Sequence, residues 1–257
     1  MPLRIFKNPT VILPSNYIIL VSHMRANTSL LGHIFGSHND ISGYYEHHIG
    51  YYSWKSLIRL KLKFIEENPQ EPKSITYFDK VLHSGHAIKA GVFDSSRTTL
   101  LFVLRKPELT IKSIVAMYQR MNKAHPHAEI QNAVDYYIER AQQIVQVARD
   151  YAGKSDIAYM DAEALIEKTE ETLVSLSTWC RLDPALTSEY KIFELTGKKV
   201  VGDSSKMITS GKVEKSVRKY DEIELSEWQL EQAENTYMKC RDELLLLCSN
   251  KHMINDV

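Results

Sequence analysis

Short apolar runs alternate with amphipathic segments along this 257-residue chain. The runs at 16–21 (NYIILV) and within 98–107 (TTLLFVLRKP) are apolar at successive positions, which is typical of parallel strands buried on both faces. Further strands are expected at 40–46, 74–80 and 156–160. Apolar positions spaced near 3.6 residues predict helices at 28–37, 51–68, 107–117, 130–148, 169–182 and 225–248.

Strands that alternate with helices indicate an α/β fold with three layers, in which helices flank a central parallel sheet. The chain shows no internal repeat or linker, and we interpret residues 1–257 as a single domain with a long polar loop at 197–219. Ligands of such sheets bind at the carboxyl ends of the strands. We therefore expect the four residues at predicted strand ends to line one crevice: Arg25, Glu46, Lys80 and Arg105.

Composition excludes several classes of function. The formal net charge is zero, so the chain has no overall basic field to attract nucleic acid or an anionic membrane, and an anion site must be built locally. The cysteines Cys180, Cys240 and Cys248 are odd in number and lack CxxC spacing, which favours a reduced, intracellular protein. No signal peptide and no run of about 18 apolar residues is visible, so a cytoplasmic protein is expected.

The segment RANTSLL, which begins at Arg25, joins the first strand to a helix. A helix N-terminus offers unpaired N–H groups and partial positive charge, while Thr28 and Ser29 add hydroxyl donors and Arg25 adds a full charge. Together they suit a phosphate. The alternative is that Asn27 or Thr28 simply caps the helix and that Arg25 is a solvated surface residue.

A second motif, RKPELTIKS, places Arg105 at a strand end and Ser113 eight residues later, within the following helix. Together the two motifs resemble those of the soluble, bacterial-type sulfotransferases that use 3'-phosphoadenosine-5'-phosphosulfate (PAPS). Residues 157–182 (IAYMDAEALIEKTEETLVSLSTWCRL) look like the Tyr-x-Asp-Leu strand and helix pair of that family. Residues 201–213 (VGDSSKMITSGKV) are similar to its late loop, which closes over the nucleotide.

The resemblance implies a P-loop-NTPase-like sulfotransferase fold, PAPS as cosubstrate and 3'-phosphoadenosine-5'-phosphate as product. It implies that Arg25 holds the phosphosulfate, that the loop and helix start bind the 5'-phosphate, and that Arg105 and Ser113 bind the 3'-phosphate with help from the late loop. The cofactor-binding residues implied in this way are Arg25, Ala26, Asn27, Thr28, Ser29, Leu30, Arg105, Ser113, Lys206, Ser210 and Gly211.

The chain departs from the family pattern at three of these positions. Ala26 and Asn27 replace a small hydroxyl residue and a glycine. Asparagine tolerates the left-handed conformation better than most residues, so the turn can survive. Lys206 stands where many relatives carry arginine.

Sulfonyl transfer needs an in-line nucleophile, donors for the leaving phosphate and usually a base. We favour Glu46 as the base because of its strand-end position, with His47 and His48 as rivals and a surface ion pair as the alternative role of Glu46. Lys80 resembles a family lysine beside the transferring sulfonate, or is a snorkelling strand-end lysine. The predicted catalytic residues are Glu46, Arg25, Lys80 and His48, and we expect His83 and His86 to be within reach of the acceptor.

Four other functions are less compatible with the sequence: a P-loop kinase, a Rossmann dehydrogenase, a metal hydrolase and a non-catalytic nucleotide-binding protein. The chain lacks the G-x-G-x-x-G pattern of a Rossmann dehydrogenase. Residues 21–29 contain no glycine and lack the G-x-x-x-x-G-K-[ST] pattern of a P-loop kinase, and a non-catalytic nucleotide-binding protein would not need Glu46 or Lys80. No metal site is expected, because the adjacent His47 and His48 would point to opposite faces of a strand.

The expected partner is a small-molecule acceptor, a hydroxyl or amine of a natural product or sugar in specialised metabolism, contacted by residues 44–60, 83–96 and 120–130. No nucleic acid or membrane partner is expected, and a homo-oligomer is left open.

Overall fold

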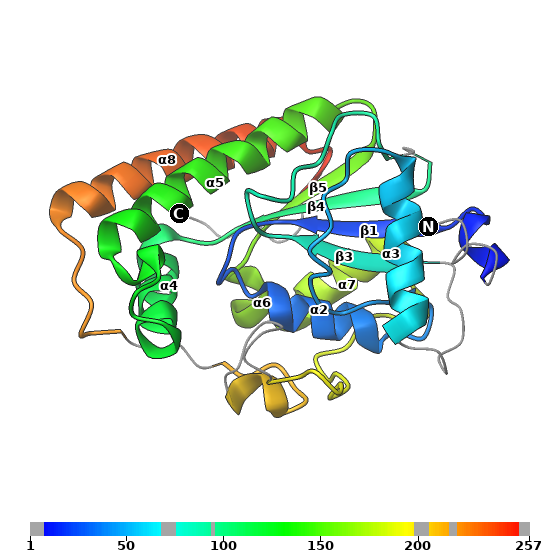
Figure 1. The fold of residues 1–257 in the computed structure, drawn as a ribbon, viewed down its shortest axis with the longest axis horizontal. Helices are drawn as coiled ribbons and strands as arrows, with labels where there is room; N and C mark the ends of the chain where they lie inside the picture. Colours follow the sequence, from blue (N-terminus) through cyan, green and yellow to red (C-terminus); the bar gives the residue numbers. More distant parts are fainter. Residues whose placement is uncertain (1–7, 68–75, 94–95, 198–205, 216–219, 252–257) are drawn as a thin grey trace.

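The computed structural model describes residues 8–67, 76–93, 96–197, 206–215 and 220–251. Six strands form one sheet in the order β2-β3-β1-β4-β5-β6, and each pairing between neighbours is parallel (Figure 1). The strands are β1 Asn16–Val21, β2 Ile41–Ser42, β3 Thr76–Val81, β4 Thr98–Leu104, β5 Asp156–Asp161 and β6 Asn250–Lys251.

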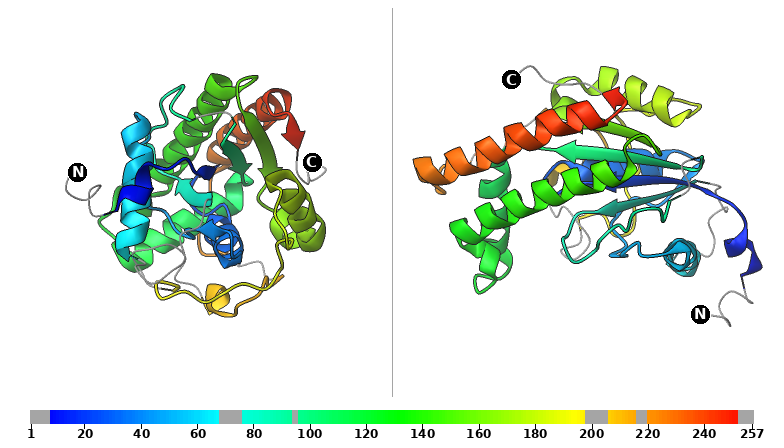
Figure 2. Two further views of the ribbon diagram at one scale, coloured as in Figure 1. Left: turned by 90° about the vertical axis from the view of Figure 1, so that its right-hand side faces the viewer. Right: turned by 90° about the horizontal axis from the view of Figure 1, so that it is seen from above.

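Helices cover both faces of the sheet, as Figures 1 and 2 show. One face packs against α3 Trp54–Glu67, α4 Pro107–Met121, α5 Ile130–Tyr151 and α8 Glu227–Leu247. The other packs against α2 Thr28–Ser37, α6 Ala164–Glu167 and α7 Thr169–Cys180. This is the three-layer α/β architecture that the alternation of strands and helices predicts, so the expected fold class is confirmed.

The central strands explain why the sheet is buried on both sides. In β1 the side chains alternate between the two faces, so that Ile19 and Val21 belong to one core and Ile18 and Leu20 to the other. The chain runs from β1 to β2 and then to β3, which both lie on one side of β1 in the sheet. After β3 it crosses to β4, on the other side of β1. The strand order therefore reverses beside β1, and such a reversal opens a ligand crevice at the carboxyl ends of the strands.

Several element boundaries differ from the sequence prediction. The second strand is only Ile41–Ser42, and residues 43–50 are irregular, so the strand predicted at 40–46 is wrong beyond its first residues. A short helix, α6, precedes α7, so that two helices follow β5 as the resemblance over residues 157–182 implied, whereas β6, which joins the sheet after α8, was not predicted. The predicted loop at 197–219 contains one turn of 3-10 helix at Lys206–Thr209, and its segments 198–205 and 216–219 lie outside the described residues.

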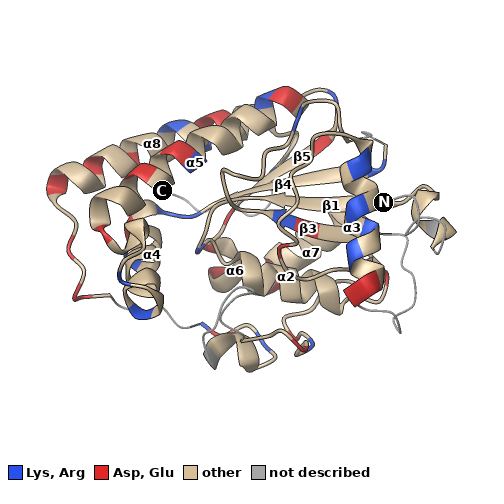
Figure 3. Cartoon of the chain, in the orientation of Figure 1, with Lys and Arg blue, Asp and Glu red and all other residues tan. Residues whose placement is uncertain are grey.

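Local signals account well for α8. Ser226 caps it with a complete capping box, in which Gln229 N donates to Ser226 Oγ and Ser226 N donates to the Gln229 side chain. Acidic and basic residues are interspersed along its exposed face and along α5 (Figure 3). Among the residues that the structure describes, no helix combines the length and apolar character that crossing a membrane requires.

Candidate functional site

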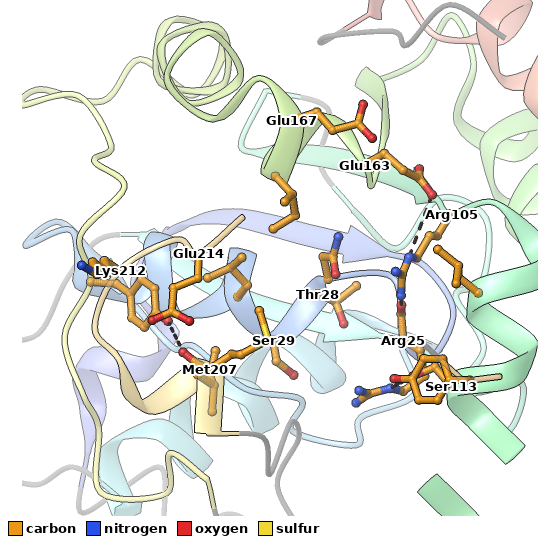
Figure 4. Close-up of a pocket in the computed structure, with 17 residues that line it drawn as sticks. Arg25, Thr28, Ser29, Arg105, Ser113, Glu163, Glu167, Met207, Lys212 and Glu214 are labelled. Atoms are coloured by element: carbon orange, nitrogen blue, oxygen red, sulfur yellow. Dashed lines mark hydrogen bonds and ion pairs between the residues drawn. The ribbon is translucent and has the colours of Figure 1, made fainter. Parts of the chain in front are cut away.

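A cavity lies where the loop after β1, the start of α4 and the segment around residues 207–214 meet (Figure 4). Arg25, Thr28 and Ser29 line it from the loop and the first turn of α2, while Arg105 and Ser113 line it from the end of β4 and from α4. The structure therefore brings both sequence motifs to one cavity, at the sheet edge where the strand order reverses.

The loop after β1 turns without glycine. Arg25 and Asn27 both have left-handed backbone conformations, with φ values of 65° and 55°. Asn27 is the residue before α2, yet its side chain does not cap the helix, and its Nδ2 instead donates to the carbonyl oxygen of Ala162, 2.9 Å away. The turn is thus held by a bond to the chain after β5, and the N–H groups at the start of α2 keep their orientation toward the cavity edge.

Arg25 and Ser113 are in direct contact. The Nε of Arg25 donates to Ser113 Oγ at 2.9 Å, and the hydroxyl of Tyr220 donates to the same oxygen at 3.0 Å. Two donors therefore occupy the acceptor lone pairs of Ser113, and its own O–H is the group left to donate to a ligand. Sequence reasoning expected Arg25 and Ser113 at opposite ends of the nucleotide and missed Tyr220, which follows a segment without clear periodicity.

Hydrogen bonds hold both the backbone and the side chain of Arg105. Its backbone N donates to His23 Nε2 at 3.1 Å, its carbonyl accepts from the Tyr137 hydroxyl at 2.7 Å, and its Nη1 donates to the Arg25 carbonyl at 2.8 Å. Burial lowers the pKa of His23 to about 4, so this imidazole is neutral near pH 7 and its Nε2 can accept. Its position between a buried strand and Arg25 was the only sequence signal for His23, and the sequence analysis did not identify His23 as a site residue.

Acidic residues also reach the cavity. Glu163 Oε1 lies 3.9 Å from Arg105 Nε and accepts from the backbone N of Lys106 at 3.0 Å. Glu167 lies on the same side, and Glu214 lies near Lys212 on the opposite side of the view in Figure 4. Positive charge is therefore concentrated at Arg25 and Arg105, beside the start of α2, and we place an anion there.

Of the other residues predicted to bind the nucleotide, only some line the cavity. Leu30 lines the cavity, whereas Ala26 is buried in the core against α2. Ser210 and Gly211 do not line it. They shape a turn, in which Ser210 Oγ donates to the Met207 carbonyl at 2.8 Å, while the neighbouring Lys212 reaches the cavity. The side chain of Lys206 lies outside the described residues.

A second polar group follows β2 and β3. Glu46 is 8% exposed, and its Oε1 accepts from the backbone N of Leu82 at 3.1 Å. Its carboxylate lies 3.8 Å from His48 Nδ1 and 3.4 Å from His83 Nε2. The predicted base and two of its histidine neighbours thus converge, although Glu46 stands in a loop four residues beyond β2 and not at a strand end.

His47 and Lys80 point elsewhere. His47 is buried, and desolvation, with the nearby charge of Lys63, lowers its pKa to about 3. Lys80 is 2% exposed and pairs in register with Leu20, which places its side chain on the α2 face of the sheet. The next residue back, Asp79, faces the other way, and its two oxygens accept from His47 N and from the Tyr51 hydroxyl.

Buried residues of α5 join the two polar groups. The Tyr136 hydroxyl accepts from Met24 N and donates to the Leu82 carbonyl, at 3.0 and 3.1 Å. Arg140 donates to the carbonyls of Ser22 and Val81, at 2.9 and 2.6 Å. The loops after β1 and β3 are thereby tied side by side, so that Glu46 and Arg25 share one edge of the sheet. An arginine within the apolar face of a predicted helix was the available signal for Arg140, and sequence reasoning missed it.

Known structures share this fold. A sulfotransferase domain from the curacin biosynthetic pathway is similar with a TM-score of 0.61 and 15% identity, over 89% of this chain and 98% of that one. A sulfotransferase domain from the Synechococcus PCC 7002 olefin synthase is similar with a TM-score of 0.54 and 16% identity, over 87% and 94% of the two chains. No protein-family model matches the sequence, and no curated protein matches it significantly. The chain therefore has the fold of sulfotransferase domains along most of its length.

Proposed function

We propose that this protein is a sulfotransferase that moves a sulfonate group from PAPS to a hydroxyl or amine of a small-molecule acceptor. The observation that carries the proposal is the meeting of Arg25, Arg105 and Ser113 in one cavity at the N-terminus of α2. A glycine-free loop that still presents a helix N-terminus and two arginines suits a ligand with more than one phosphate-like group. The fold shared with sulfotransferase domains supports the same assignment.

In this proposal the two ends of the nucleotide contact different residues of the cavity. Arg25, with the backbone N–H groups and hydroxyls of Thr28 and Ser29, would hold the phosphosulfate end, and Arg105 with the free O–H of Ser113 would hold the 3'-phosphate. The Arg105 guanidinium is held at the cavity wall by the bond from Nη1 to the Arg25 carbonyl and by Glu163, which lies 3.9 Å from Nε, while His23 and Tyr137 fix the Arg105 backbone. The late-loop residue Lys212 would add a charge beside the nucleotide.

The proposed reaction needs only the donor, the acceptor and a protein base. The acceptor oxygen or nitrogen attacks sulfur, the bond from sulfur to the bridging oxygen breaks, and the electron pair stays on the 5'-phosphate. Arg25 and the α2 N-terminus stabilise the charge that develops on this leaving oxygen, and the loss of one such donor typically costs roughly 10²- to 10³-fold in kcat. Glu46 takes the acceptor proton, with His48 as the rival base. The sequence also proposed Lys80 beside the sulfonate, but its side chain is buried on the α2 face of the sheet and does not line the cavity, so we assign it no direct role.

Calorimetry with adenosine 3',5'-bisphosphate tests the nucleotide site. We expect tight binding by the full chain and clear weakening in Arg105→Ala, while Arg59→Ala, which removes an exposed arginine of α3, serves as the matched control. A preference for ATP over the bisphosphate would instead indicate a kinase or phosphotransferase. Tight bisphosphate binding without transfer to any acceptor would indicate a non-catalytic nucleotide-binding protein.

The base is tested separately by Glu46→Gln. This change keeps the size of the side chain and an oxygen that can accept from Leu82 N, but it removes the carboxylate. We expect turnover with labelled PAPS to be abolished while bisphosphate affinity is unchanged. Full activity of Glu46→Gln would indicate that His48 or His83 is the base. A screen of hydroxyl- and amine-bearing natural products and sugars identifies the acceptor. We propose that the enzyme acts in the cytoplasm, in specialised metabolism.

A further inference from the structure

Four side chains form a cluster beside the proposed acceptor position: Glu46, His48, His83 and His86, here called the histidine cluster. One ligand atom each from Glu46, His48 and His86 lies within 4.8 Å of the other two. His83 adds a fourth group, since its Nε2 is 3.4 Å from Glu46 Oε2. Two loops that are distant in sequence supply these residues, one after β2 and one after β3.

The spacing of Glu46, His48 and His86 is near that of ligands in a tetrahedral metal site, and the spacing of His83 is wider. With metal–nitrogen bonds of about 2.1 Å, two ligand atoms stand roughly 3.4 Å apart and two coordinating imidazole centroids roughly 5–5.5 Å apart. The observed separations of Glu46 oxygens from His83 Nε2 and His48 Nδ1 are 3.4 and 3.8 Å. The ring centroids of His48 and His86 are 5.4 Å apart, whereas that of His83 is 5.9 Å from His48 and 6.4 Å from His86, so His83 must move inward to complete the site.

The same separations are poor for hydrogen bonds, which form at 2.7–3.2 Å between nitrogen and oxygen. Nδ1 of His86 is completely covered and has no hydrogen-bond partner among the described residues. His48 has a left-handed backbone with φ of 53°, a conformation that costs free energy and that turns its side chain back toward Glu46. Protein groups alone therefore leave the cluster incompletely satisfied.

We propose that the histidine cluster binds one divalent transition-metal ion of the Zn²⁺ type, with Glu46, His48 and His86 as ligands and His83 as the fourth. Three imidazoles and one carboxylate are donors typical of zinc, whereas magnesium and calcium prefer oxygen alone. The sequence expectation of no metal site assumed that residues 46–48 lie on a strand. They form a loop, so that Glu46 and His48 face one another while His47 is buried on the other side.

The site has a consequence for the proposed reaction, and this consequence rests on the proposed function. A carboxylate bound to Zn²⁺ cannot accept the proton of an acceptor. Zn²⁺ would therefore inhibit sulfonate transfer without weakening the binding of adenosine 3',5'-bisphosphate, because Arg25, Arg105 and Ser113 are not part of the histidine cluster.

The test uses the tag-free full chain and two probes, Zn²⁺ by calorimetry and Co²⁺ by visible absorption. We expect one ion per chain and the intense absorption of tetrahedral Co²⁺. His48→Ala and His86→Ala should each weaken binding at least about tenfold, since the loss of an indirect supporting residue alone costs roughly 10- to 100-fold. His125→Ala is the matched control, because His125 stacks on Tyr118 outside the cluster and should leave affinity unchanged.

Two results would overturn the proposal. One is the absence of a Zn²⁺ heat signal with the wild-type chain, and the other is affinity that is the same in wild type, His48→Ala and His86→Ala. His48 is half exposed, so its replacement leaves the fold intact and the comparison remains interpretable if His86→Ala is unstable. The metal titration and the bisphosphate titration are separate measurements, so failure of one proposal is distinguished from failure of the other.

Discussion

Ser113→Ala tests how the cavity recognises the 3'-phosphate. In the wild type, Arg25 Nε and the Tyr220 hydroxyl both donate to Ser113 Oγ, and no described residue accepts from its O–H. Alanine therefore removes the only donor that Ser113 can offer to a ligand, and it also leaves Arg25 Nε without this acceptor. The hydrogen bond that is lost goes to a charged ligand, and one such bond contributes about 1.5–3 kcal/mol to the binding free energy.

This free energy corresponds to a bisphosphate affinity that is roughly 10- to 150-fold weaker. The assay is calorimetry with two ligands, adenosine 3',5'-bisphosphate and adenosine 5'-phosphate, after thermal melts confirm that the variant is folded. If Ser113 contacts the 3'-phosphate, the loss is confined mainly to the bisphosphate. Tyr220→Phe is the comparison variant, because it removes a donor to Ser113 but leaves the Ser113 O–H in place. Since Tyr220 also lines the cavity, we expect a smaller loss of bisphosphate affinity than in Ser113→Ala.

Two outcomes would refute this reasoning. Equal losses for both ligands would show that Ser113 acts only by holding Arg25, and that the 3'-phosphate lies elsewhere. Unchanged affinity for both would show that the pair formed by Arg25 and Ser113 is a structural contact outside the nucleotide site.

Three further predictions concern stability. Arg241→Ala breaks the bidentate pair with Asp161, at 2.9 and 3.0 Å in the core, and should lower the free energy of unfolding by about 3–5 kcal/mol in urea titrations; a loss below 1 kcal/mol would contradict a buried ion pair. Burial raises the pKa of Asp79 from 3.8 to about 7, so the folded state holds its proton in this range, and the contribution of Asp79 to stability should fall by roughly 1.4 kcal/mol per pH unit as pH rises from about 4 to 7. The buried imidazoles of His23 and His47 have lowered pKa values and contribute with the opposite sign, so the Asp79 contribution is measured as the difference between wild type and Asp79→Asn. Asp79→Asn should flatten that slope, and identical pH profiles would rule the shift out. Asn27→Val and Asn27→Gly both lose the bond to the Ala162 carbonyl, but only valine resists the left-handed conformation. Asn27→Val should therefore be less stable than Asn27→Gly by about 1–3 kcal/mol, and equal melting temperatures of the two variants would contradict the need for that conformation.

Much of the fold is readable in the chain because its signals are local. β1 and α2 have the boundaries that apolar runs and helical spacing predict, and Ser226 caps α8 as its residue type indicates. The second strand was overextended because the aromatic and polar residues after Ser42 resemble a strand, whereas their path is set by contacts with β3 such as that of His47 N with Asp79.

The residues of the candidate site also differ in how far the sequence alone predicted them. Arg25, Thr28, Ser29, Arg105 and Ser113 were found from motifs, because each stands at a fixed offset from a strand end. His23, Tyr136, Arg140 and Tyr220 were missed, because they act through bonds to residues 80 or more positions away, or to backbone groups of other strands. No local pattern encodes such a pairing.

The sequence by itself determined the order of strands and helices, the parallel sheet and the placing of two arginines at strand ends, since periodicity and strand-end position are properties of neighbouring residues. Only the tertiary structure decided that Arg25 bonds Ser113, that Lys80 and Asp79 take opposite faces, and that Glu46 meets three histidines. The physical reason is that these arrangements depend on the packing of loops from different strands at one sheet edge, where distances are set by the whole fold.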